Sequence, residues 1–298
     1  MDLPVLQPKS DALKPRRRLP EWLSKPFSFS EEVHDLKARL RDRGLHTVCE
    51  EARCPNLGEC WSQKTATFMI LGEVCTRHCG FCSVTAGKPE AVDIEEPQKI
   101  AEMISYLGLK HAVITCVARD DLEDRGAEHF VRVIETIREK QPNCAVEILT
   151  TDFDMQEPLM ERVCRAKPDV FNHNLETVER LSPRVRHRAS YCNSLTFLSR
   201  IKKFDSSMKT KSGMMLGLGE TRSEVQQAMR DLREVGCEIL TMGQYLQPTP
   251  HNLPVVDFIR PEVFKELEIF GYELGFQSVA SGPFVRSSYH AGEMIRGI

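Results

Sequence analysis

The sequence lacks any long apolar run and any dominant charge. No stretch approaches the roughly 20 apolar residues that a membrane-spanning helix requires, and the start has no apolar segment of the kind that marks a secretory signal. The formal net charge is −3 over 298 residues, so no global field would attract nucleic acid or an anionic membrane. Acidic residues interrupt the N-terminal segment, which argues against a transit peptide, and we expect a cytoplasmic protein.

Cysteine is the residue type that stands out. The chain has 11 cysteines, and in a chain without secretory features these are more often metal ligands or catalysts than disulfides. Six of them fall into two groups of three: Cys49, Cys54 and Cys60 (the first cysteine group), and Cys75, Cys79 and Cys82 (the second cysteine group). Five others are scattered, and we expect them to be small buried hydrophobic side chains: Cys116, Cys144, Cys164, Cys192 and Cys237.

Strand-like and helix-like segments alternate after the cysteine-rich stretch. We expect strands at 67–71, 111–116, 145–149, 170–174, 212–216 and 238–243. We expect helices near 97–107, 127–140, 156–166, 190–204 and 221–235, and from Pro261 to about 274. Repeated units of this kind imply a parallel sheet with right-handed crossovers. Six units predict an α/β fold, an open partial (β/α)6 TIM-like barrel rather than a closed eight-stranded one, with its chemistry at the carboxyl ends of the strands.

The regions outside this barrel divide into three. Residues 1–27 contain five prolines and a basic cluster, which predicts an extended, solvated arm, with docking of an acidic partner as the alternative. Residues 28–64 form an N-terminal extension, in which Ser30 is expected to cap a helix with a Val33, Leu36 and Leu40 stripe that ends at Gly44. The barrel is assigned to 65–280, and 281–298 form a C-terminal tail.

The second cysteine group lies in the loop that leaves the 67–71 strand. Three thiolates are one ligand fewer than the four that saturate a four-iron cluster, so one iron would keep an open position. The offsets of 4 and 7 also suit one face of a helix, so a buried thiol stripe is the alternative interpretation. Gly72, Gly80 and the polar side chains of Arg77 and His78 argue against a packed helix here.

The first cysteine group has offsets of 5 and 11, which do not align on one helical face. Pro55 and Gly58 break regular structure between these cysteines, so a looped ligand set is expected. Structural zinc is the alternative, although zinc sites usually use closer pairs of cysteines.

Taken together, these motifs resemble those of one enzyme family. The second cysteine group, with Phe81 before its last member, is similar to the radical S-adenosylmethionine (SAM) signature. The segment from Cys49 to Cys60 resembles the auxiliary-cluster motif of lipoyl synthases, and the tail sequence at 286–289 (RSSY) matches the C-terminal motif of that family. The resemblance covers roughly residues 20–292.

The resemblance implies an activity and its cofactors. Lipoyl synthases are sulfurtransferases that insert two sulfur atoms at C6 and C8 of a protein-bound octanoyl chain, while SAM is reductively cleaved to 5′-deoxyadenosine and methionine. The second cysteine group would hold the SAM-binding [4Fe-4S] cluster and act in catalysis. The first cysteine group and Ser288 would hold an auxiliary [4Fe-4S] cluster that gives up sulfur, with Ser287 as the alternative serine. An alkoxide is a harder ligand than a thiolate and could leave when a sulfide is attacked.

Further segments resemble the family: 113–122 its stretch after the second strand, 171–177 its SAM-binding motif, and 213–220 its next conserved stretch. They supply candidate polar contacts, and two glycines that would let the backbone approach the nucleoside closely. These candidates are Arg119, Asn172, His173, Asn174, Glu176, Gly217 and Gly219. The alternative for each polar residue is a surface side chain at a strand end.

The chain departs from the family pattern at two places. The stretch 186–191 (RHRASY) lacks the Pro-Gly expected after its first arginine, and Arg125 stands where a second glycine often precedes Gly126. These differences put local loop geometry and substrate contacts in doubt, but not the cluster ligands.

The resemblance also implies partners. These are octanoylated carrier proteins (lipoyl domains of 2-oxoacid dehydrogenases and the glycine cleavage H protein), a ferredoxin- or flavodoxin-type reductant and an iron–sulfur cluster carrier. No nucleic-acid or membrane partner is expected. Two alternatives stay open: another sulfur-inserting radical SAM enzyme, resembling biotin synthase, and a non-catalytic iron–sulfur or zinc protein.

Overall fold

The computed structural model describes residues 18–24, 31–51, 54–62, 67–289 and 291–296. The expected arm at 1–27 therefore lies almost wholly outside the described residues, as does Ser30, the expected helix cap. Within these ranges, no helix is long and apolar enough to cross a membrane.

A twisted, mainly parallel sheet organises the described chain. Its strand order is β1-β2-β5-β6-β7-β8-β9-β10, and only β1 runs antiparallel to its neighbour. The bounds are β1 His46–Thr47, β2 Thr67–Ile70, β5 His111–Cys116, β6 Ala145–Leu149, β7 Val170–Asn172, β8 Lys209–Leu216, β9 Ile239–Gln244 and β10 Ser278–Gly282. The described sheet begins at β1 and ends at β10 without closing, which confirms the open partial barrel.

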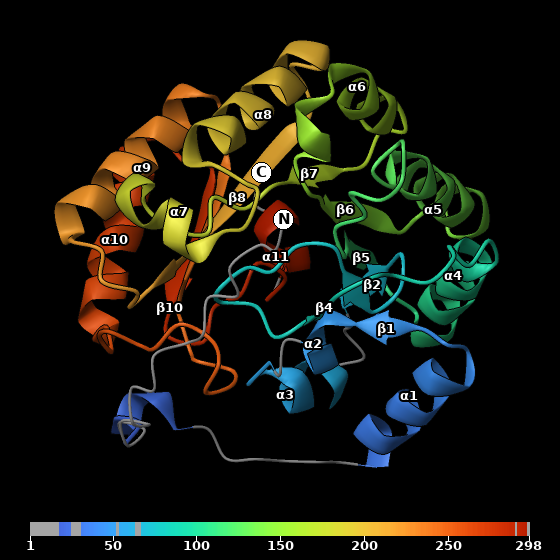
Figure 1. The fold of residues 1–298 in the computed structure, drawn as a ribbon, viewed down its shortest axis with the longest axis horizontal. Helices are drawn as coiled ribbons and strands as arrows, with labels where there is room; N and C mark the ends of the chain where they lie inside the picture. The colour runs from blue at the N-terminus through green and yellow to red at the C-terminus, as the bar shows by residue number, and fades with distance from the viewer. Residues whose placement is uncertain (1–17, 25–30, 52–53, 63–66, 290, 297–298) are drawn as a thin grey trace, which may run out of the picture.

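Six helices follow the six expected strands and cover the outer face of the sheet (Figure 1). They are α4 Glu96–Leu107, α5 Ala127–Lys140, α6 Glu157–Arg165, α8 Tyr191–Phe204, α9 Arg222–Glu234 and α10 Pro261–Glu273. Each expected element is confirmed within a few residues of its predicted bounds. Strand β10, which pairs parallel to β9, was not expected. Its sequence, SVASG, is short and weakly apolar, so periodicity gave little sign of it.

Local sequence signals explain several boundaries of these helices. Gly108 ends α4 with φ 64°, a left-handed conformation that glycine adopts without a steric penalty. Thr221 and Glu224 form a reciprocal capping box at the start of α9, a feature worth about 1 kcal/mol. Pro261 occupies the first turn of α10, where its missing N–H costs nothing.

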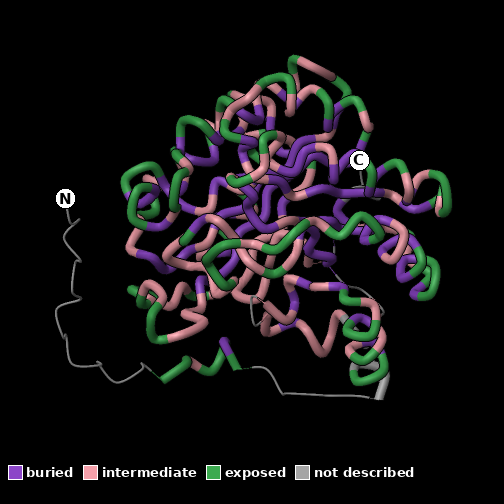
Figure 2. The backbone as a smooth tube through the Cα atoms, turned by 45° about the vertical axis from the view of Figure 1, so that its right-hand side comes forward, coloured by how far each residue is buried: buried purple, intermediate pink, exposed green. Residues whose placement is uncertain are grey.

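The core lies between the outer helices and the sheet, and the buried backbone gathers there in Figure 2. Val146 and Ile148 of β6 are fully buried against these helices, so the intervening Glu147 faces the interior of the barrel. Phe153 sits between Phe130 and Phe197, with ring centroids 6.1 and 6.2 Å away. Each such fully buried aromatic side chain contributes about 2–3 kcal/mol by burial.

The N-terminal extension packs at the β1 edge of the sheet. It comprises the helices α1 Glu31–Asp42, α2 Val48–Glu51 and α3 Leu57–Ser62, whereas the 3-10 helix Glu21–Leu23 lies in the segment assigned to the arm. Leu36 and Leu40 are buried, at 3% and 0% exposed, which confirms two positions of the expected stripe. Gly44 follows the helix with φ 63°. The division of the chain into arm, extension, barrel and tail stays a prediction.

The C-terminal tail turns back into the open barrel. After β10 it runs through a turn and ends in α11 Ala291–Arg296, which lies inside the ring of strands in Figure 1. Met294 packs against Val170 and Ile239, which begin β7 and β9. The tail therefore occupies the interior of the barrel and is in direct contact with its strands.

Candidate active site

The second cysteine group lies in an irregular loop at the carboxyl end of β2. Cys75 ends the short strand β3 Val74–Cys75, which pairs with β4 Thr85–Ala86, and Cys79 and Cys82 follow in non-helical backbone. The buried helical thiol stripe is therefore wrong. Cysteines in a loop can point toward a common metal centre, as the binding site of a cluster requires.

Backbone amides point at the sulfur atoms of this loop. The N–H groups of Arg77 and Ala118 donate to Cys75 Sγ at 3.4 and 3.3 Å, and the N–H of His187 donates to Cys79 Sγ at 3.4 Å. Such donors favour thiolate and help to set the reduction potential of a bound cluster. Burial raises the pKa of Cys82 to about 12, so iron binding would have to displace its proton.

A buried arginine locks this loop to the neighbouring strands. Arg77 donates to Asp120, with Nη2 to Oδ1 at 2.9 Å, and to Asp152 at 2.8 Å; its side chain is 8% exposed. Burial alone would raise the pKa of Asp120, but the hydrogen bonds from Arg77 hold it below its usual value. The loop is thus tied to the segments that follow β5 and β6.

Both departures from the family pattern bear on this same loop. Arg125 has φ 53° and Arg188 has φ 55°, a left-handed conformation that costs a non-glycine residue roughly 1–2 kcal/mol. The backbone at these two positions therefore adopts a conformation that glycine favours, although the residue is arginine. Arg125 donates to the carbonyl of Asp120 at 3.0 Å, and Arg188 lies 3.5 Å from the Asp120 carboxylate.

The first cysteine group is carried by two short helices and the turn between them. Cys49 lies in α2 and is 7% exposed, Cys60 lies in α3, and Cys54 lies between them. The expectation of a purely looped ligand set is thus corrected for two of the three cysteines. Backbone hydrogen bonds from Cys54 N to Cys49 O and from Cys60 N to Asn56 O hold the cysteines in one compact turn.

A single tetrahedral zinc ion would require the three sulfur atoms of a cysteine group to lie close together. Thiolates about 2.3 Å from a tetrahedral zinc lie within roughly 4 Å of one another. Among the described residues, neither cysteine group brings three ligand atoms within 4.8 Å of one another. In this structure neither group therefore has the arrangement of a preformed single-zinc site.

The tail joins the first cysteine group to the barrel. Asn56 Nδ2 donates to the Phe284 carbonyl at 2.7 Å, and Tyr289 Oη donates to Glu59 Oε1 at 2.7 Å. Burial lowers the pKa of Arg286, and its electrostatic interaction with Cys54 opposes this shift. The 286–289 motif is therefore placed beside α3 by contacts that span about 230 residues of sequence.

Glycines on the barrel interior make room for the tail. A Cβ atom on Gly243 of β9 would lie 2.0 Å from the carbonyl oxygen of Val285, and one on Gly213 of β8 would lie 3.0 Å from Ser287 Oγ. Ser287 hydrogen-bonds with Asn174, whereas the Ser288 hydroxyl forms no hydrogen bond with the other described residues. The two serines thus differ in their surroundings.

The SAM-motif residues at 172–176 fall into two sets. Asn174 and Glu176 lie at the mouth of the barrel, half-buried, and Nδ2 of Asn174 donates to Glu176 Oε1 at 3.1 Å. His173 is turned into the protein, where Nε2 lies 2.9 Å from Ser194 Oγ and the ring stacks on Phe197. Burial lowers the pKa of His173 to about 4, so the ring is neutral at physiological pH.

Asn172 joins an ionic network inside the barrel. Its Nδ2 donates to Glu147, which also accepts from buried Lys211 at 2.8 Å, and its Oδ1 is buried without a partner among the described residues. The sequence gave no sign of this network, because strand alternation predicts inward positions but not which of them pair.

The other predicted SAM contacts are engaged with the chain itself. Arg119 is 3% exposed and pairs with Asp121 at 2.9 Å. Gly217 and Gly219 have φ 102° and 108°. A Cβ on Gly217 would lie 2.5 Å from the Asp257 carbonyl, so the close approach at this glycine is made by the protein. The SAM roles of these residues stay predictions, as do those of the four residues in 172–176.

The expectation for the scattered cysteines is confirmed in part. Cys144, Cys164 and Cys237 are buried, Cys116 is half-buried, and Cys192 is exposed. Cys192 lies on the outer surface near the start of α8, so burial was the wrong prediction for it.

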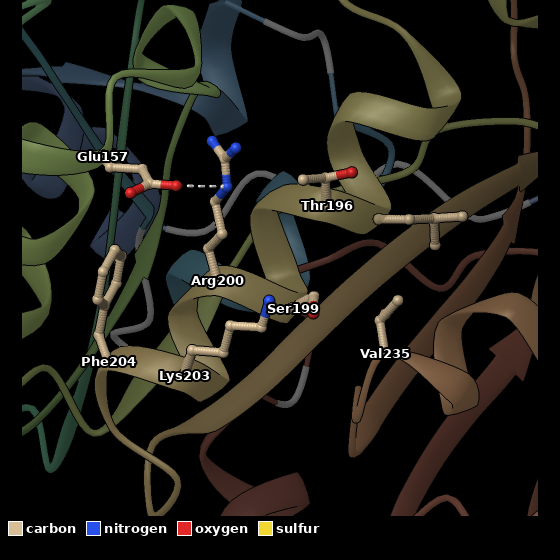
Figure 3. A pocket seen from close by; sticks show the side chains of 8 residues that line it. Glu157, Thr196, Ser199, Arg200, Lys203, Phe204 and Val235 are labelled. Carbon is tan, nitrogen blue, oxygen red and sulfur yellow. Dashed lines mark ion pairs between the residues drawn. The ribbon is translucent and has the colours of Figure 1, made fainter.

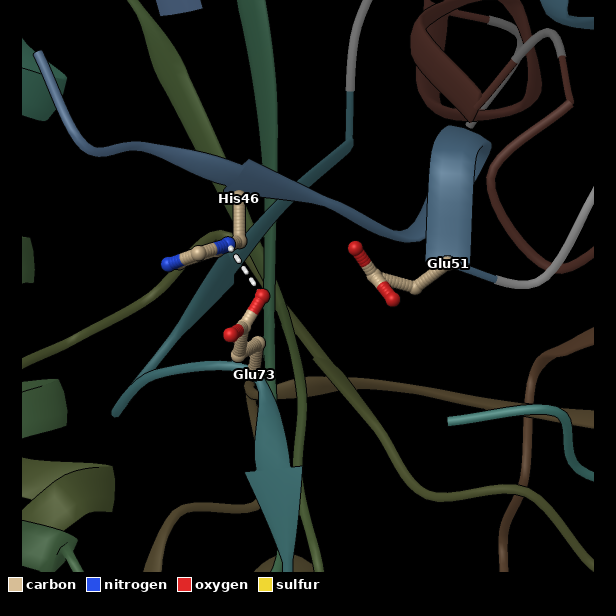
Figure 4. A group of neighbouring side chains, drawn as sticks. All are labelled: His46, Glu51 and Glu73. Atoms are coloured by element: carbon tan, nitrogen blue, oxygen red, sulfur yellow. Dashed lines mark ion pairs between the residues drawn. The ribbon is translucent and has the colours of Figure 1, made fainter. Parts of the chain in front are cut away.

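Two other features lie outside these motifs. A pocket of about 500 Å³ on the outer side of α8 is lined by Lys203 and by an Arg200–Glu157 ion pair (Figure 3). It shares no residue with the predicted site. His46, Glu51 and Glu73 bring ligand atoms within 4.8 Å of one another (Figure 4). The Glu73 side chain is 62% exposed and pairs with His46 at 3.7 Å, so we assign no metal to this group.

Solved structures share this fold. Methylornithine synthase (PylB) superposes with a TM-score of 0.55 at 13% identity, over 85% of this chain and 83% of that one. HydG, a maturase of the [FeFe]-hydrogenase, gives 0.56 at 15% identity, over 91% of this chain and 67% of that one. At such identities the likeness concerns the fold alone.

Family models and close relatives go further. The model of the radical SAM superfamily matches residues 69–232, and that of the N-terminal domain of lipoyl synthase matches residues 6–54. A lipoyl synthase of Rubrobacter xylanophilus is 51% identical over 93% of this chain and 87% of the relative. One of Caldicellulosiruptor saccharolyticus is 51% identical over 92% of this chain and 96% of the relative. The chain therefore belongs to the lipoyl synthase family of radical SAM enzymes.

Proposed function

We propose that this chain inserts sulfur at C6 and C8 of a protein-bound octanoyl chain by combining its two cysteine groups in one site that the tail completes. Membership of the family makes it a radical SAM sulfurtransferase that uses a [4Fe-4S] cluster. Its substrates are SAM and lipoyl-carrier proteins. The observation that carries the residue-level proposal is the seating of the 286–289 motif between α3 and Asn174.

The second cysteine group supplies three ligands for the SAM-binding cluster. Cys75 and Cys79 accept backbone hydrogen bonds, and Arg77 fixes the loop on Asp120 and Asp152. Three thiolates leave one iron position open, which SAM would occupy. The hydrogen bond from the His187 N–H to Cys79 Sγ at 3.4 Å supports a site in which this group lies near the 186–191 segment.

The first cysteine group and Ser288 are proposed to hold the auxiliary cluster. Cys49, Cys54 and Cys60 lie in one compact segment and would supply three of the four ligands of a four-iron cluster. The Ser288 hydroxyl has no hydrogen bond to the other described residues, whereas that of Ser287 is occupied by Asn174. Ser288 is therefore the better candidate for the fourth, oxygen ligand.

The bound groups would supply the chemistry that side chains lack: reductive cleavage of SAM at one cluster and sulfur at the other. The chain supplies positioning. Asn174 and Glu176 offer hydrogen-bonding groups at the mouth, the tail brings the first cysteine group to the barrel, and α11 fills the interior behind them.

The proposal includes further partners and a compartment. A ferredoxin- or flavodoxin-type protein would donate electrons, and a cluster carrier would rebuild the auxiliary cluster after its sulfur is used. All 11 cysteines are free thiols in the structure, which suits a reducing compartment such as the cytoplasm.

Anaerobic turnover tests the proposal directly. The reconstituted protein, an octanoyl-lysyl peptide, SAM and a reductant should yield 5′-deoxyadenosine and a peptide that carries two sulfur atoms, read by mass spectrometry. Analysis should find iron and acid-labile sulfide for two four-iron clusters. Zinc without sulfide, or SAM cleavage without any sulfur in the peptide, would contradict it.

A further inference from the structure

The side chain of Ser287 forms a two-way contact with Asn174. Asn174 Nδ2 donates to Ser287 Oγ at 2.8 Å, and Ser287 Oγ donates back to Asn174 Oδ1 at 3.1 Å. The other donor of the Asn174 amide is used by Glu176 Oε1 at 3.1 Å. The single proton of the serine and both protons of the amide are thus committed.

The hydrogen-bonding capacity that Asn174, Ser287 and Glu176 still have is all acceptor capacity. Asn174 Oδ1 and Ser287 Oγ each keep one lone pair, and the Glu176 carboxylate keeps several. This trio therefore suits a ligand that presents hydrogen-bond donors, such as the ribose hydroxyls or the ammonium group of SAM. Of these three residues, Ser287 belongs to the tail, whereas Asn174 and Glu176 belong to the barrel.

The position of Ser287 leaves it little freedom to move alone. A Cβ on Gly213 would lie 2.8 Å from Asn174 Oδ1 and 3.0 Å from Ser287 Oγ, so the pair lies directly on the β8 backbone. Before Ser287 in the chain, the Val285 carbonyl packs closely against Gly243. After it, Tyr289 donates a hydrogen bond to Glu59 of α3. Any change at Ser287 is therefore passed to the neighbouring Ser288.

We propose that Ser287 is a positioning residue that completes the SAM site through Asn174 and so couples SAM binding to the seating of the tail. The proposal rests on the proposed function and deepens it. Coupling between two sites is reciprocal: if the seated tail strengthens SAM binding, bound SAM must stabilise the seated tail by the same factor. The first cysteine group would thus receive its serine ligand most firmly when SAM is in place.

The test uses the full chain with reconstituted clusters and the uncleaved analogue S-adenosylhomocysteine. Two quantities are measured: the dissociation constant, and amide hydrogen exchange in residues 284–289 with and without the analogue. In the unmodified protein, the analogue should slow this exchange. Ser287→Ala should weaken binding about tenfold and remove the slowing, whereas Ser287→Thr, which keeps the hydroxyl, should restore both in part.

Ser281→Ala is the matched control, because Ser281 Oγ donates to the Phe264 carbonyl and lies away from Asn174. It should leave both measurements unchanged. Unaltered binding and intact slowing in Ser287→Ala would overturn the inference while leaving the proposed function intact. Failure of the unmodified, cluster-loaded protein to bind the analogue at all would instead contradict the proposed function.

Discussion

The two cysteine groups are held in place in different ways. The second cysteine group is supported by nearby strands: amides of Arg77 and Ala118 reach Cys75, and Arg77 bridges Asp120 and Asp152. The first cysteine group lies on two short helices and the turn between them, and the tail reaches it from about 230 residues away. One half of the site is thus an integral part of the barrel, whereas the other is completed by the end of the chain.

This difference suits the roles proposed for the two groups. A cluster that binds SAM in every turnover gains from a fixed loop, because positioned donors set its potential. A cluster that is consumed and rebuilt needs access, which a detachable tail and a serine ligand would provide. The predictions below separate the two supports.

The largest effects are expected at the cysteines themselves. Cys75→Ala should abolish 5′-deoxyadenosine formation but leave the auxiliary cluster assembled, because its ligands lie on separate elements. Cys54→Ala should do the reverse and permit SAM cleavage without sulfur insertion. Chromatographic assay of 5′-deoxyadenosine and lipoyl peptide from both variants decides the matter. Loss of both clusters in either variant would show that the two sites do not assemble independently.

Ser288→Ala should lose lipoyl formation and keep SAM cleavage, because only the auxiliary cluster would be missing a ligand. Ser287→Ala should do less damage and should recover sulfur insertion at saturating SAM. Product ratios of the two variants, measured over a range of SAM concentrations, test the different roles of these neighbours. Full sulfur insertion by Ser288→Ala would refute its role as a ligand.

Arg77→Met breaks the local support of the second cysteine group. It leaves the Asp152 carboxylate buried without its cation, and breaking a buried pair typically costs 3–5 kcal/mol. We expect faster loss of the SAM-binding cluster to a chelator, followed by absorbance, with the auxiliary cluster less affected. The double variant Arg77→Met/Asp152→Asn removes the uncompensated charge and should recover part of the stability. Equal loss of both clusters would contradict a local role.

Gly243→Ala disturbs the packing of the tail on β9, and the tail is the remote support of the first cysteine group. The added methyl group would lie 2.0 Å from the Val285 carbonyl oxygen, so the tail has to shift, at a cost of about 1–3 kcal/mol. Sulfur insertion should fall more than SAM cleavage. Gly275→Ala controls for a destabilising glycine replacement away from the tail, because its Cβ would meet nothing within 4 Å although its φ of 87° strains an alanine. Hydrogen exchange of the tail amides, measured in both variants, should rise only in Gly243→Ala.

Much of the fold followed from local patterns. The six strand–helix units were predictable because apolar periodicity, caps such as Thr221–Glu224 and the first-turn Pro261 all act within a few residues. Strand β10 was missed because five small, weakly apolar residues carry no period. Its strand conformation depends on pairing with β9, which is a contact between distant segments.

For the candidate site as well, some features follow from the local sequence and others from contacts between distant segments. The sequence by itself determined the two cysteine groups, their spacing and the RSSY motif, because ligand type and short spacing are properties of the local chain. Only the tertiary structure decided that Ser287 contacts Asn174, that Tyr289 contacts Glu59 and that His173 is turned inward. These contacts join residues 21 to 230 positions apart. They exist because sheet pairing and two inward glycines, Gly213 and Gly243, let the tail enter the barrel, which no local pattern specifies.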